Sequence, residues 1–342
     1  MAAYTAIDDP SAFFKCQLYV GDGSANHAIT FDDTDTDMQP DFVWIKNRET
    51  TDVHCLFDSV RGATKLLSSD AITAESTDAD TLDSFTSDGF QVDADVKVNT
   101  NTEKYVAWNW KETADAGFDI VAYTGNGTDG ATVSHSLGAV PNLLITKGRS
   151  VGDGWVIFFK NPSGGNPHIM GLNNNLADRY GTRYDPFFSS TAPTSSVFTL
   201  GDDTEVNTDG GTFIAYLWTE KQGFSKFGSY TGFANADGPF VYTGFRPALV
   251  IIKGAVSGAG DAAQNWELYD NKRLGYNVDN NTLFPSTTAA DNTADRIDIL
   301  SNGFKIRVNS DGVNDSGSTY IYMAFAEAPF VTGSGGVPCN AR

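Results

Sequence analysis

Three short stretches decide the fold: Pro40-Asp-Phe-Val-Trp-Ile-Lys46, Pro141-Asn-Leu-Leu-Ile-Thr-Lys147 and Pro247-Ala-Leu-Val-Ile-Ile-Lys253. Each begins at a proline, continues as a largely apolar run and ends at a lysine. An apolar run without polar alternation is typical of a strand that is buried on both faces. The sequence therefore predicts three central β-strands at matching places in the chain.

Other features recur in the same order around these stretches. A Tyr-x-Gly step precedes each one, at Tyr19, Tyr123 and Tyr230. A Val-Asn pair follows each one, ending at Asn99, Asn207 and Asn314. An aromatic-rich strand then closes each unit at Glu112, Glu220 and Glu327. Four features in register three times indicate an internal repeat, and we expect three β modules covering residues 19–112, 123–220 and 230–327.

The rest of the chain has the composition of an all-β protein. Gly makes up 34 of the 342 residues, and the apolar segments are short and bounded by Gly, Asn or Asp. We predict three tandem β-sandwich, jelly-roll-like modules related by the repeat. The sequence leaves open whether they form a row or a closed ring, and it predicts a three-lobed molecule held by weak contacts.

The two ends of the chain and the turns carry further predictions. Asp9 and Pro10 predict a short helix inside an N-terminal segment of residues 1–18, and residues 328–342 are expected to form a flexible tail. The Asn of each Val-Asn pair is expected in a turn, where it can tolerate a left-handed conformation. Asp88-Gly89 and Asn302-Gly303 predict β-hairpins.

Charge and cysteine content exclude several classes of protein. The chain carries 23 Lys and Arg against 43 Asp and Glu, a formal charge of −20, which argues against nucleic-acid binding. It has no apolar run of the length that membrane insertion by a helix requires, and the N-terminal sequence lacks the features of a signal peptide. Cys16, Cys55 and Cys339 are scattered, so neither a disulfide framework nor a zinc site is expected.

Catalytic and metal-binding patterns are weak, and we expect no enzyme and no cofactor. His54 stands where the other repeats have Trp155 and Trp266, which favours packing over catalysis. The closing glutamates occur three times, whereas one active site would not need three copies. Asp33, Asp35 and Asp37 alternate as at the start of an EF-hand, but Met38 and Trp44 replace the required Gly and Glu, so a solvated acidic loop is expected there, with weak Ca²⁺ or Mg²⁺ binding as the alternative.

Loops rich in Tyr and Arg are the candidate binding residues, because these side chains supply contact energy at interfaces. The second module offers Tyr180, Arg183, Tyr184 and Phe187, and the third offers Arg273 and Tyr276. The alternative is that they pack on their own modules, with Phe187 and Phe188 beginning a strand.

Several segments resemble one family of proteins. They are Tyr4-Thr-Ala-Ile-Asp-Asp-Pro-Ser-Ala-Phe-Phe14, Leu18-Tyr-Val-Gly-Asp-Gly23, the stretch at Pro40 and the closing Gly-Val-Pro-Cys-Asn-Ala-Arg342. In these the chain resembles virion structural proteins of marine tailed phages, especially those that infect cyanobacteria. The resemblance implies a particle component that is made in the host cytoplasm and assembled onto the virion.

The resemblance leads to one favoured function and two alternatives. The favoured one is a non-enzymatic, tail-associated fibre or spike component that contributes to host attachment. In it, residues 1–18 are the docking segment that binds the particle, and the modules face the host surface. Its expected partners are other virion proteins, further copies of itself, a trimer being favoured, and a glycan or protein of the host surface. The first alternative is a capsid decoration or head-fibre protein, and the remote one is a polysaccharide-degrading tailspike.

Overall fold

The computed structural model describes residues 5–31, 36–176, 178, 180–256, 264–273, 277 and 281–331. Their secondary structure comprises 23 β-strands in antiparallel sheets, four short α-helices and one 3-10 turn. The all-β prediction is therefore confirmed. Within these residues no helix has the length and apolar character needed to cross a membrane.

Three larger sheets share one strand order. The first is β1 (Phe14–Val20), β9 (Lys104–Trp110), β3 (Phe42–Asn47), β4 (Cys55–Asp58), β5 (Lys65–Ser68) and β6 (Ser76–Thr77). The second is β10 (Phe118–Thr124), β16 (Thr212–Trp218), β12 (Leu143–Gly148), β13 (Trp155–Phe159) and β14 (His168–Gly171). The third is β17 (Ser225–Thr231), β23 (Thr319–Pro329), β19 (Phe245–Val256) and β20 (Glu267–Asp270). The strands predicted to be central, β3, β12 and β19, each lie between two neighbours. We refer to residues 14–110, 118–218 and 225–329 as repeats 1, 2 and 3.

A smaller sheet covers one face of each larger sheet. These sheets are β2 (His27–Thr30), β8 (Gly89–Val92) and β7 (Leu82–Thr86) in repeat 1, β11 (Ala131–Ser134) and β15 (Val197–Leu200) in repeat 2, and β18 (Phe240–Tyr242), β22 (Gly303–Ile306) and β21 (Ile297–Leu300) in repeat 3. An edge-to-face ring pair joins the two layers each time: Tyr19 with Phe90, Tyr123 with Phe198 and Tyr230 with Phe304, at 6.0, 5.9 and 6.2 Å. Each repeat is thus built as a β-sandwich.

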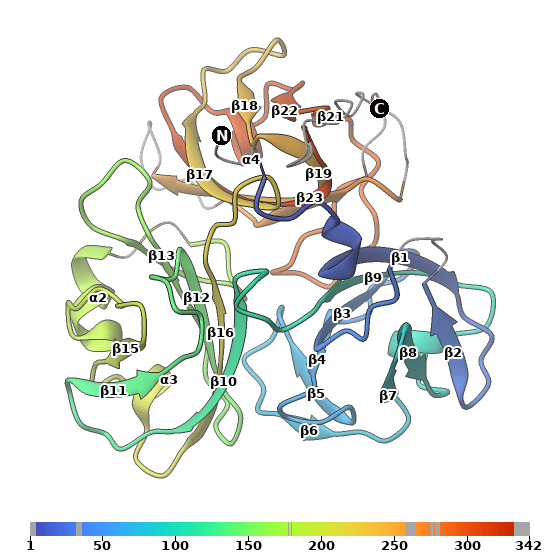
Figure 1. Ribbon diagram of the computed structural model, residues 1–342, viewed down its shortest axis with the longest axis horizontal. Helices are drawn as coiled ribbons and strands as arrows, with labels where there is room; N and C mark the ends of the chain where they lie inside the picture. The colour runs from blue at the N-terminus through green and yellow to red at the C-terminus, as the bar shows by residue number, and fades with distance from the viewer. Residues whose placement is uncertain are drawn as a thin grey trace.

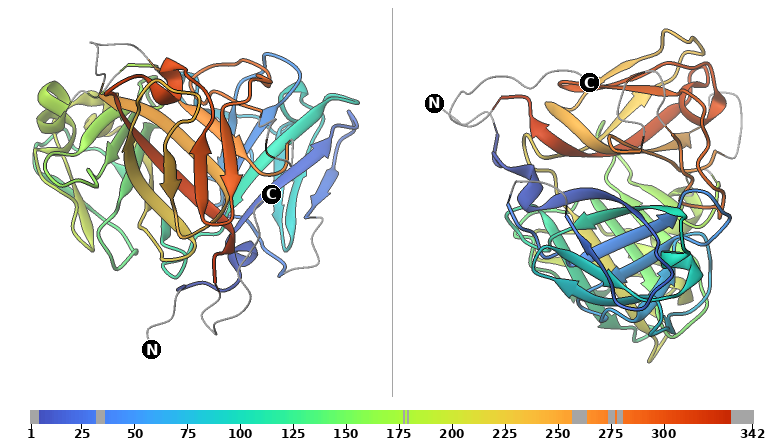
Figure 2. Two further views of the ribbon diagram at one scale, coloured as in Figure 1. Left: turned by 90° about the horizontal axis from the view of Figure 1, so that it is seen from above. Right: turned by 90° about the vertical axis from the view of Figure 1, so that its right-hand side faces the viewer.

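The three repeats surround a common centre and close into a ring (Figure 1). A backbone hydrogen bond of the same kind joins each repeat to the next: Glu75 N to Arg149 O at 2.8 Å, Asp178 N to Ala255 O at 3.1 Å, and Asp291 N to Arg48 O at 2.9 Å. Because the last of these bonds returns from repeat 3 to repeat 1, the arrangement is a ring and not a row. The side views in Figure 2 show repeat 3, in orange and red, lying against repeat 1, in blue and cyan.

The second face of each larger sheet packs on a shared aromatic core. Trp110 lies 6.3 Å from Trp218 and 5.5 Å from Phe325, measured between ring centroids, so all three repeats meet there. Two polar bonds cross the same core, from Tyr216 Oη to Asp58 and from Trp108 Nε1 to Asp270. The expectation of weakly held lobes was wrong, because large aromatic side chains bury so much apolar area that contact between repeats is a main source of stability.

The N-terminal segment differs from its prediction. The helix is a single 3-10 turn, η1 (Pro10–Ala12), capped by Asp9, whose carboxylate accepts a hydrogen bond from Ser11 N. Strand β1 begins at Phe14 and pairs with β9, so part of the predicted docking segment belongs to repeat 1. The docking role of the residues before Phe14 stays a prediction. Residues 332–342 lie outside the described part of the chain.

The recurring asparagines end one-turn helices, α1 (Val96–Asn99), α3 (Thr204–Asn207) and α4 (Asp311–Asn314). None of the three has a positive φ, so the left-handed conformation that an asparagine in a turn can tolerate is not adopted here. Each side chain is fully buried and fixes the loop after the first strand of its repeat. Its Oδ1 accepts from the backbone N–H of Asp22, Asn126 or Phe233, and its Nδ2 donates to the carbonyl of Ser24, Thr128 or Asn235.

Candidate functional site

The binding residues predicted in repeat 2 lie on a helix, α2 (Tyr180–Phe188). Tyr184 and Phe187 are buried, and the Tyr184 and Phe188 rings lie 6.0 and 5.6 Å from that of Phe158. These three side chains therefore pack on repeat 2 and are not available to a receptor, and the predicted strand start at Phe187 was wrong. The side chains of Tyr180 and Arg183 lie outside the described part.

Arg273, predicted as a binding residue in repeat 3, is also buried. Its Nε donates to Asp270 at 2.6 Å, and its Nη1 donates to Asp291 at 2.8 Å. In repeat 1, Arg61 bonds Asp58 and Glu75 in the same way. Arg273 holds in place the segment at Asp291, which closes the ring. This contact explains why Arg273 is buried. Tyr276 lies outside the described residues.

The closing glutamates of repeats 1 and 2 join each repeat to the following one. Glu112 accepts a hydrogen bond from Ile120 N at 3.1 Å, and Glu220 accepts one from Phe227 N at 3.4 Å. Glu220 also pairs with Lys226 at 2.8 Å, whereas burial and the neighbouring Asp119 and Asp41 raise the pKa of Glu112 to about 7. In repeat 3, Glu327 pairs with Arg246. These contacts give the glutamates the structural role that their repetition suggests.

Two of the three repeated lysines, Lys147 and Lys253, bond across the joints between repeats, whereas Lys46 bonds within repeat 1. Lys147 Nζ donates to Asp153 O at 2.7 Å, to Gly148 O at 3.1 Å and, across the joint, to Ile72 O at 3.4 Å. Lys253 donates across the next joint to Asn175 O at 3.1 Å. All three lysines are fully buried, and this burial lowers the pKa of Lys46 and Lys147 to about 8 and that of Lys253 to about 7.

His54 is a packing residue, as expected from its place in the repeat. The indole N–H of Trp155 donates to Ser68 O, and that of Trp266 donates to Gly171 O, each at 2.8 Å and each in the preceding repeat. His54 is fully buried, accepts a hydrogen bond from Trp44 Nε1 at 2.9 Å, and has its pKa held well below the usual value by burial.

In the described part of the chain, no group of three or more His, Cys, Asp or Glu side chains is placed to hold a metal ion. Of the weak candidates, Asp37 is exposed, and Asp33 and Asp35 lie outside the described residues. Cys16 and Cys55 are buried free thiols.

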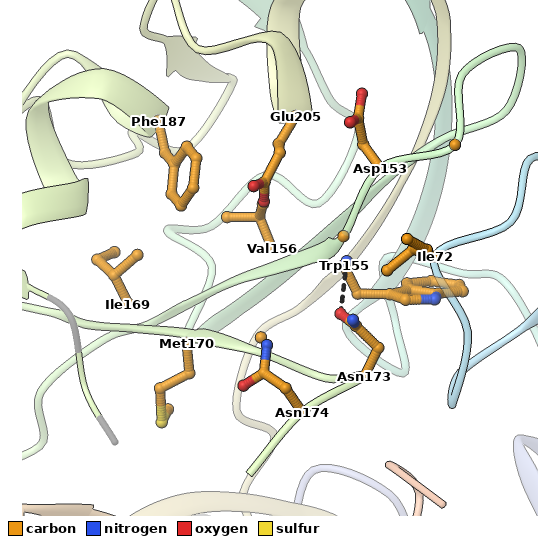
Figure 3. Close-up of a pocket in the computed structure, with 13 residues that line it drawn as sticks. Ile72, Asp153, Trp155, Val156, Ile169, Met170, Asn173, Asn174, Phe187 and Glu205 are labelled. Carbon is orange, nitrogen blue, oxygen red and sulfur yellow. Dashed lines mark hydrogen bonds between the residues drawn. The ribbon is translucent and has the colours of Figure 1, made fainter. Parts of the chain in front are cut away.

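A polar cavity lies at the joint of repeats 1 and 2 (Figure 3). It has a volume of about 270 Å³ and opens beside Ile72, a residue of repeat 1 whose side chain is exposed. One wall is apolar, made by Val156, Ile169 and Phe187, and the other carries oxygen and nitrogen atoms of Asp153, Asn173 and Glu205. Such a mixed lining suits a small polar ligand with one apolar side.

Repeat 2 has a glycine, Gly154, in the lining of this cavity. A Cβ atom at Gly154 would lie 3.1 Å from Glu205 Oε2 and 3.6 Å from Asn173 Oδ1. The residues before His54 and Trp266 in the other repeats are Val53 and Asn265, whose side chains occupy that place in the chain. Sequence comparison of the repeats could have found this site, since its signal is a side chain that repeat 2 lacks.

Residues 9–329 match the model of a family described as a domain of unknown function, DUF7483. The chain belongs to this family. No curated protein and no solved structure matches it. Family membership thus covers the whole ring and leaves the function to be argued from the molecule.

Proposed function

We propose that this protein is a virion structural component, tail-associated and of fibre or spike type, that contributes to attachment at the host surface. The proposal rests on the resemblance to phage virion proteins together with the way in which the three repeats differ. It treats the ring as a scaffold that presents binding surfaces and performs no chemistry.

One observation carries the scaffold interpretation: the repeats are alike where they are buried and differ where they are exposed. The stacked ring pairs Tyr19–Tyr105, Tyr123–Phe213 and Tyr230–Tyr320 have centroid distances of 5.0, 5.1 and 5.2 Å. Among the described residues, by contrast, the nine-residue helix α2 of repeat 2 has no counterpart in repeats 1 and 3, and the cavity beside Gly154 lies in repeat 2. A protein whose repeats keep the packing and vary the surface is suited to recognition, because loops and faces change without cost to the core.

The experiment is to purify particles of a phage that encodes this chain and to quantify the chain by mass spectrometry. A tail protein is expected at tens of copies or fewer per particle, and purified protein added in excess should slow adsorption of the phage to its host. Hundreds of copies per particle would support the capsid decoration alternative. Absence of the chain from purified particles would refute the proposal.

The two partner predictions are tested by separate measurements. Light scattering on the purified chain distinguishes the expected trimer from a monomer, and a monomer would refute self-association. Release of soluble sugar from host envelope polysaccharide by the purified chain would replace the proposed role with the tailspike alternative.

A further inference from the structure

Repeat 3 carries two exposed aromatic side chains on the outer face of its small sheet. Phe240 and Tyr242, both on β18, are 48 % and 52 % exposed, while Val241 between them points inward and is buried. Leaving two large rings in water costs the free energy that their burial would provide. Two half-exposed rings on one strand therefore call for an explanation.

The other repeats show that the fold does not need these rings. Strand pairing aligns the three small sheets, because Val241 lies opposite Phe304, Ile29 opposite Phe90, and Val133 opposite Phe198. The places of Phe240 and Tyr242 are therefore taken by Ala28 and Thr30 in repeat 1, and by Thr132 and Ser134 in repeat 2.

A third exposed ring of repeat 3 also lies where the other two repeats have a polar residue. Phe233, on the loop between β17 and β18, is 50 % exposed, and its N–H donates to Asn314. The matching donors in repeats 1 and 2 are Asp22 and Asn126. Repeat 3 thus has an aromatic ring at three exposed positions where both other repeats have small or polar residues.

Polar groups border the two rings of β18 on both sides. Opposite Phe240 on β22 is Lys305, which donates to Gly238 O at 3.0 Å and pairs with Asp237 at 2.7 Å. On the other side, Tyr242 lines a cavity of about 140 Å³ together with Gln222 and the ion pair of Glu220 and Lys226. Hydrogen-bond donors and acceptors therefore lie next to apolar ring surfaces.

From this arrangement we infer that Phe240, Tyr242 and the adjoining cavity form a binding site for a neutral carbohydrate chain. A sugar ring has C–H groups that pack on an aromatic face and hydroxyl groups that need donors and acceptors at its edge, and this surface supplies both. The two rings are two residues apart on one strand, about 6.8 Å, a spacing that lets successive parts of one saccharide lie along β18.

The charge of the molecule narrows the ligand further. The formal charge of −20 disfavours acidic saccharides and other anions, and beside the rings Lys305 and Lys226 are each paired with a carboxylate, so no unpaired cation of these two is left for an anion. A protein partner is less well suited, because a stable protein interface buries about 800 Å² on each side and has an apolar centre, whereas this aromatic surface is narrow and bordered by charges. A neutral saccharide fits both the width and the charge.

The inference deepens the proposed function, since it names the chemistry that the attachment surface recognises. The two proposals can fail independently of each other. Mass spectrometry of purified particles decides whether the chain is a virion component, and that result does not depend on whether the purified chain binds sugar. Conversely, a chain that binds sugar but is absent from particles would retain this site and lose the proposed role.

The test measures binding of the full chain to a panel of immobilised neutral glucans, galactans, mannans and N-acetylglucosamine polymers. The variant Phe240→Ala/Tyr242→Thr carries the residues of repeat 1 and should keep the stability of the wild type. The matched control, Thr132→Ala/Ser134→Ala, changes the same two positions in repeat 2.

We expect the wild type and the control to bind at least one polymer and the Phe240→Ala/Tyr242→Thr variant to bind it at least tenfold more weakly. Titration with that sugar should also shift the ring-proton NMR signals of Phe240 and Tyr242. Wild-type protein that binds no polymer of the panel, or equal binding by the two variants, overturns the inference.

Discussion

At the residue scale, some equivalent positions have different roles in the three repeats. The buried asparagines, by contrast, have the same role in each. Asn207 accepts from Asn126 N and donates to Thr128 O and Gly201 O, all from a fully buried side chain. A buried amide that satisfies three backbone groups is hard to replace, because each group left without a partner costs free energy.

The variant Asn207→Ala should therefore lower the free energy of unfolding by about 3 kcal/mol. Urea denaturation followed by tryptophan fluorescence measures the change. Asn166→Ala, at an exposed asparagine of the same repeat, is the control and should stay close to the wild type. A loss at Asn207 no larger than that of the control would remove the loop-fixing role.

Glu112 and Glu220 occupy the same place in their repeats but differ in charge environment. The pKa of Glu112 is raised to about 7 by burial and by Asp119 and Asp41, while Glu220 has Lys226 as a partner. A carboxyl whose folded pKa is raised stabilises the fold fully below its unfolded pKa, near 4.5, and loses that contribution as the pH rises through 7.

The variant Glu112→Gln should consequently be more stable than the wild type at about pH 8, with the difference vanishing as the pH falls to 4.5. The Gln keeps an oxygen for Ile120 N and cannot ionise. Urea denaturation at several pH values gives the measurement. Glu220→Gln, which only breaks a half-exposed ion pair, should change stability by less than about 1 kcal/mol. A Glu112→Gln variant that is less stable than the wild type at pH 8 would contradict this assignment.

At the element scale, the hairpins of the small sheets depend on glycines at points of close backbone approach. A Cβ atom at Gly303 would overlap the carbonyl oxygen of Val241 on the paired strand β18, and one at Gly89 would overlap that of Ile29 on β2. The Asp-Gly and Asn-Gly pairs predicted the hairpins β7–β8 and β21–β22. The third strand adds a need for glycine at both positions, and Gly89 also has a φ of 126°, which favours glycine.

The variant Gly303→Ala should lower the free energy of unfolding by more than about 2 kcal/mol, because β18 must move away from β22. Gly152→Ala is the control, since the nearest atom to its added Cβ, Ile72 O, lies at an ordinary contact distance of 3.5 Å. Thermal unfolding by circular dichroism compares the two. If Gly303→Ala and Gly152→Ala were equally stable, the small sheet would accommodate a methyl group at position 303, which would contradict the need for glycine there.

The sequence could predict the strands because their signal is local. The runs after Pro40, Pro141 and Pro247 contain their own evidence for central strands. Helix α2 carries no such signal, since Gly181 and Pro186 are poor helix formers and tertiary packing of Phe187 and Phe188 decides the structure.

The sites were missed for a related physical reason. Residue type predicts Tyr and Arg as binding residues, but it does not determine burial, and both Tyr184 and Arg273 are buried, one by packing and the other with its ion pairs. The cavity lies beside Gly154, where repeat 2 lacks a side chain that the other two repeats have. The unusual exposure of Phe240 and Tyr242 becomes evident only when the strand register aligns the three repeats.

At the scale of the whole molecule, the shared core makes the three repeats depend on one another. Phe325 of repeat 3 contacts Trp110 and Phe14 of repeat 1, at 5.5 Å each between ring centroids. The ring-closing bonds likewise pair segments far apart in the chain, which no local pattern of residues encodes.

Unfolding should accordingly be one cooperative transition, in which fluorescence of the six tryptophans and far-UV circular dichroism give coincident urea curves. The variant Phe325→Ala should lower the free energy of unfolding by about 3 kcal/mol. It should move both curves together to lower urea concentration, although it changes repeat 3 alone. Phe240→Ala, on the exposed face of the same repeat, is the control and should leave the curves in place. Separate transitions for different parts of the chain would contradict the shared core.

The most direct test of the account is a cryo-EM map of a phage particle that encodes this chain. We predict a three-lobed ring of density on the tail, with β18 and its Phe240 and Tyr242 facing away from the particle and toward the host. A particle whose map and protein content lack the chain, or a ring whose β18 face is buried against the capsid shell, would contradict a role in host attachment.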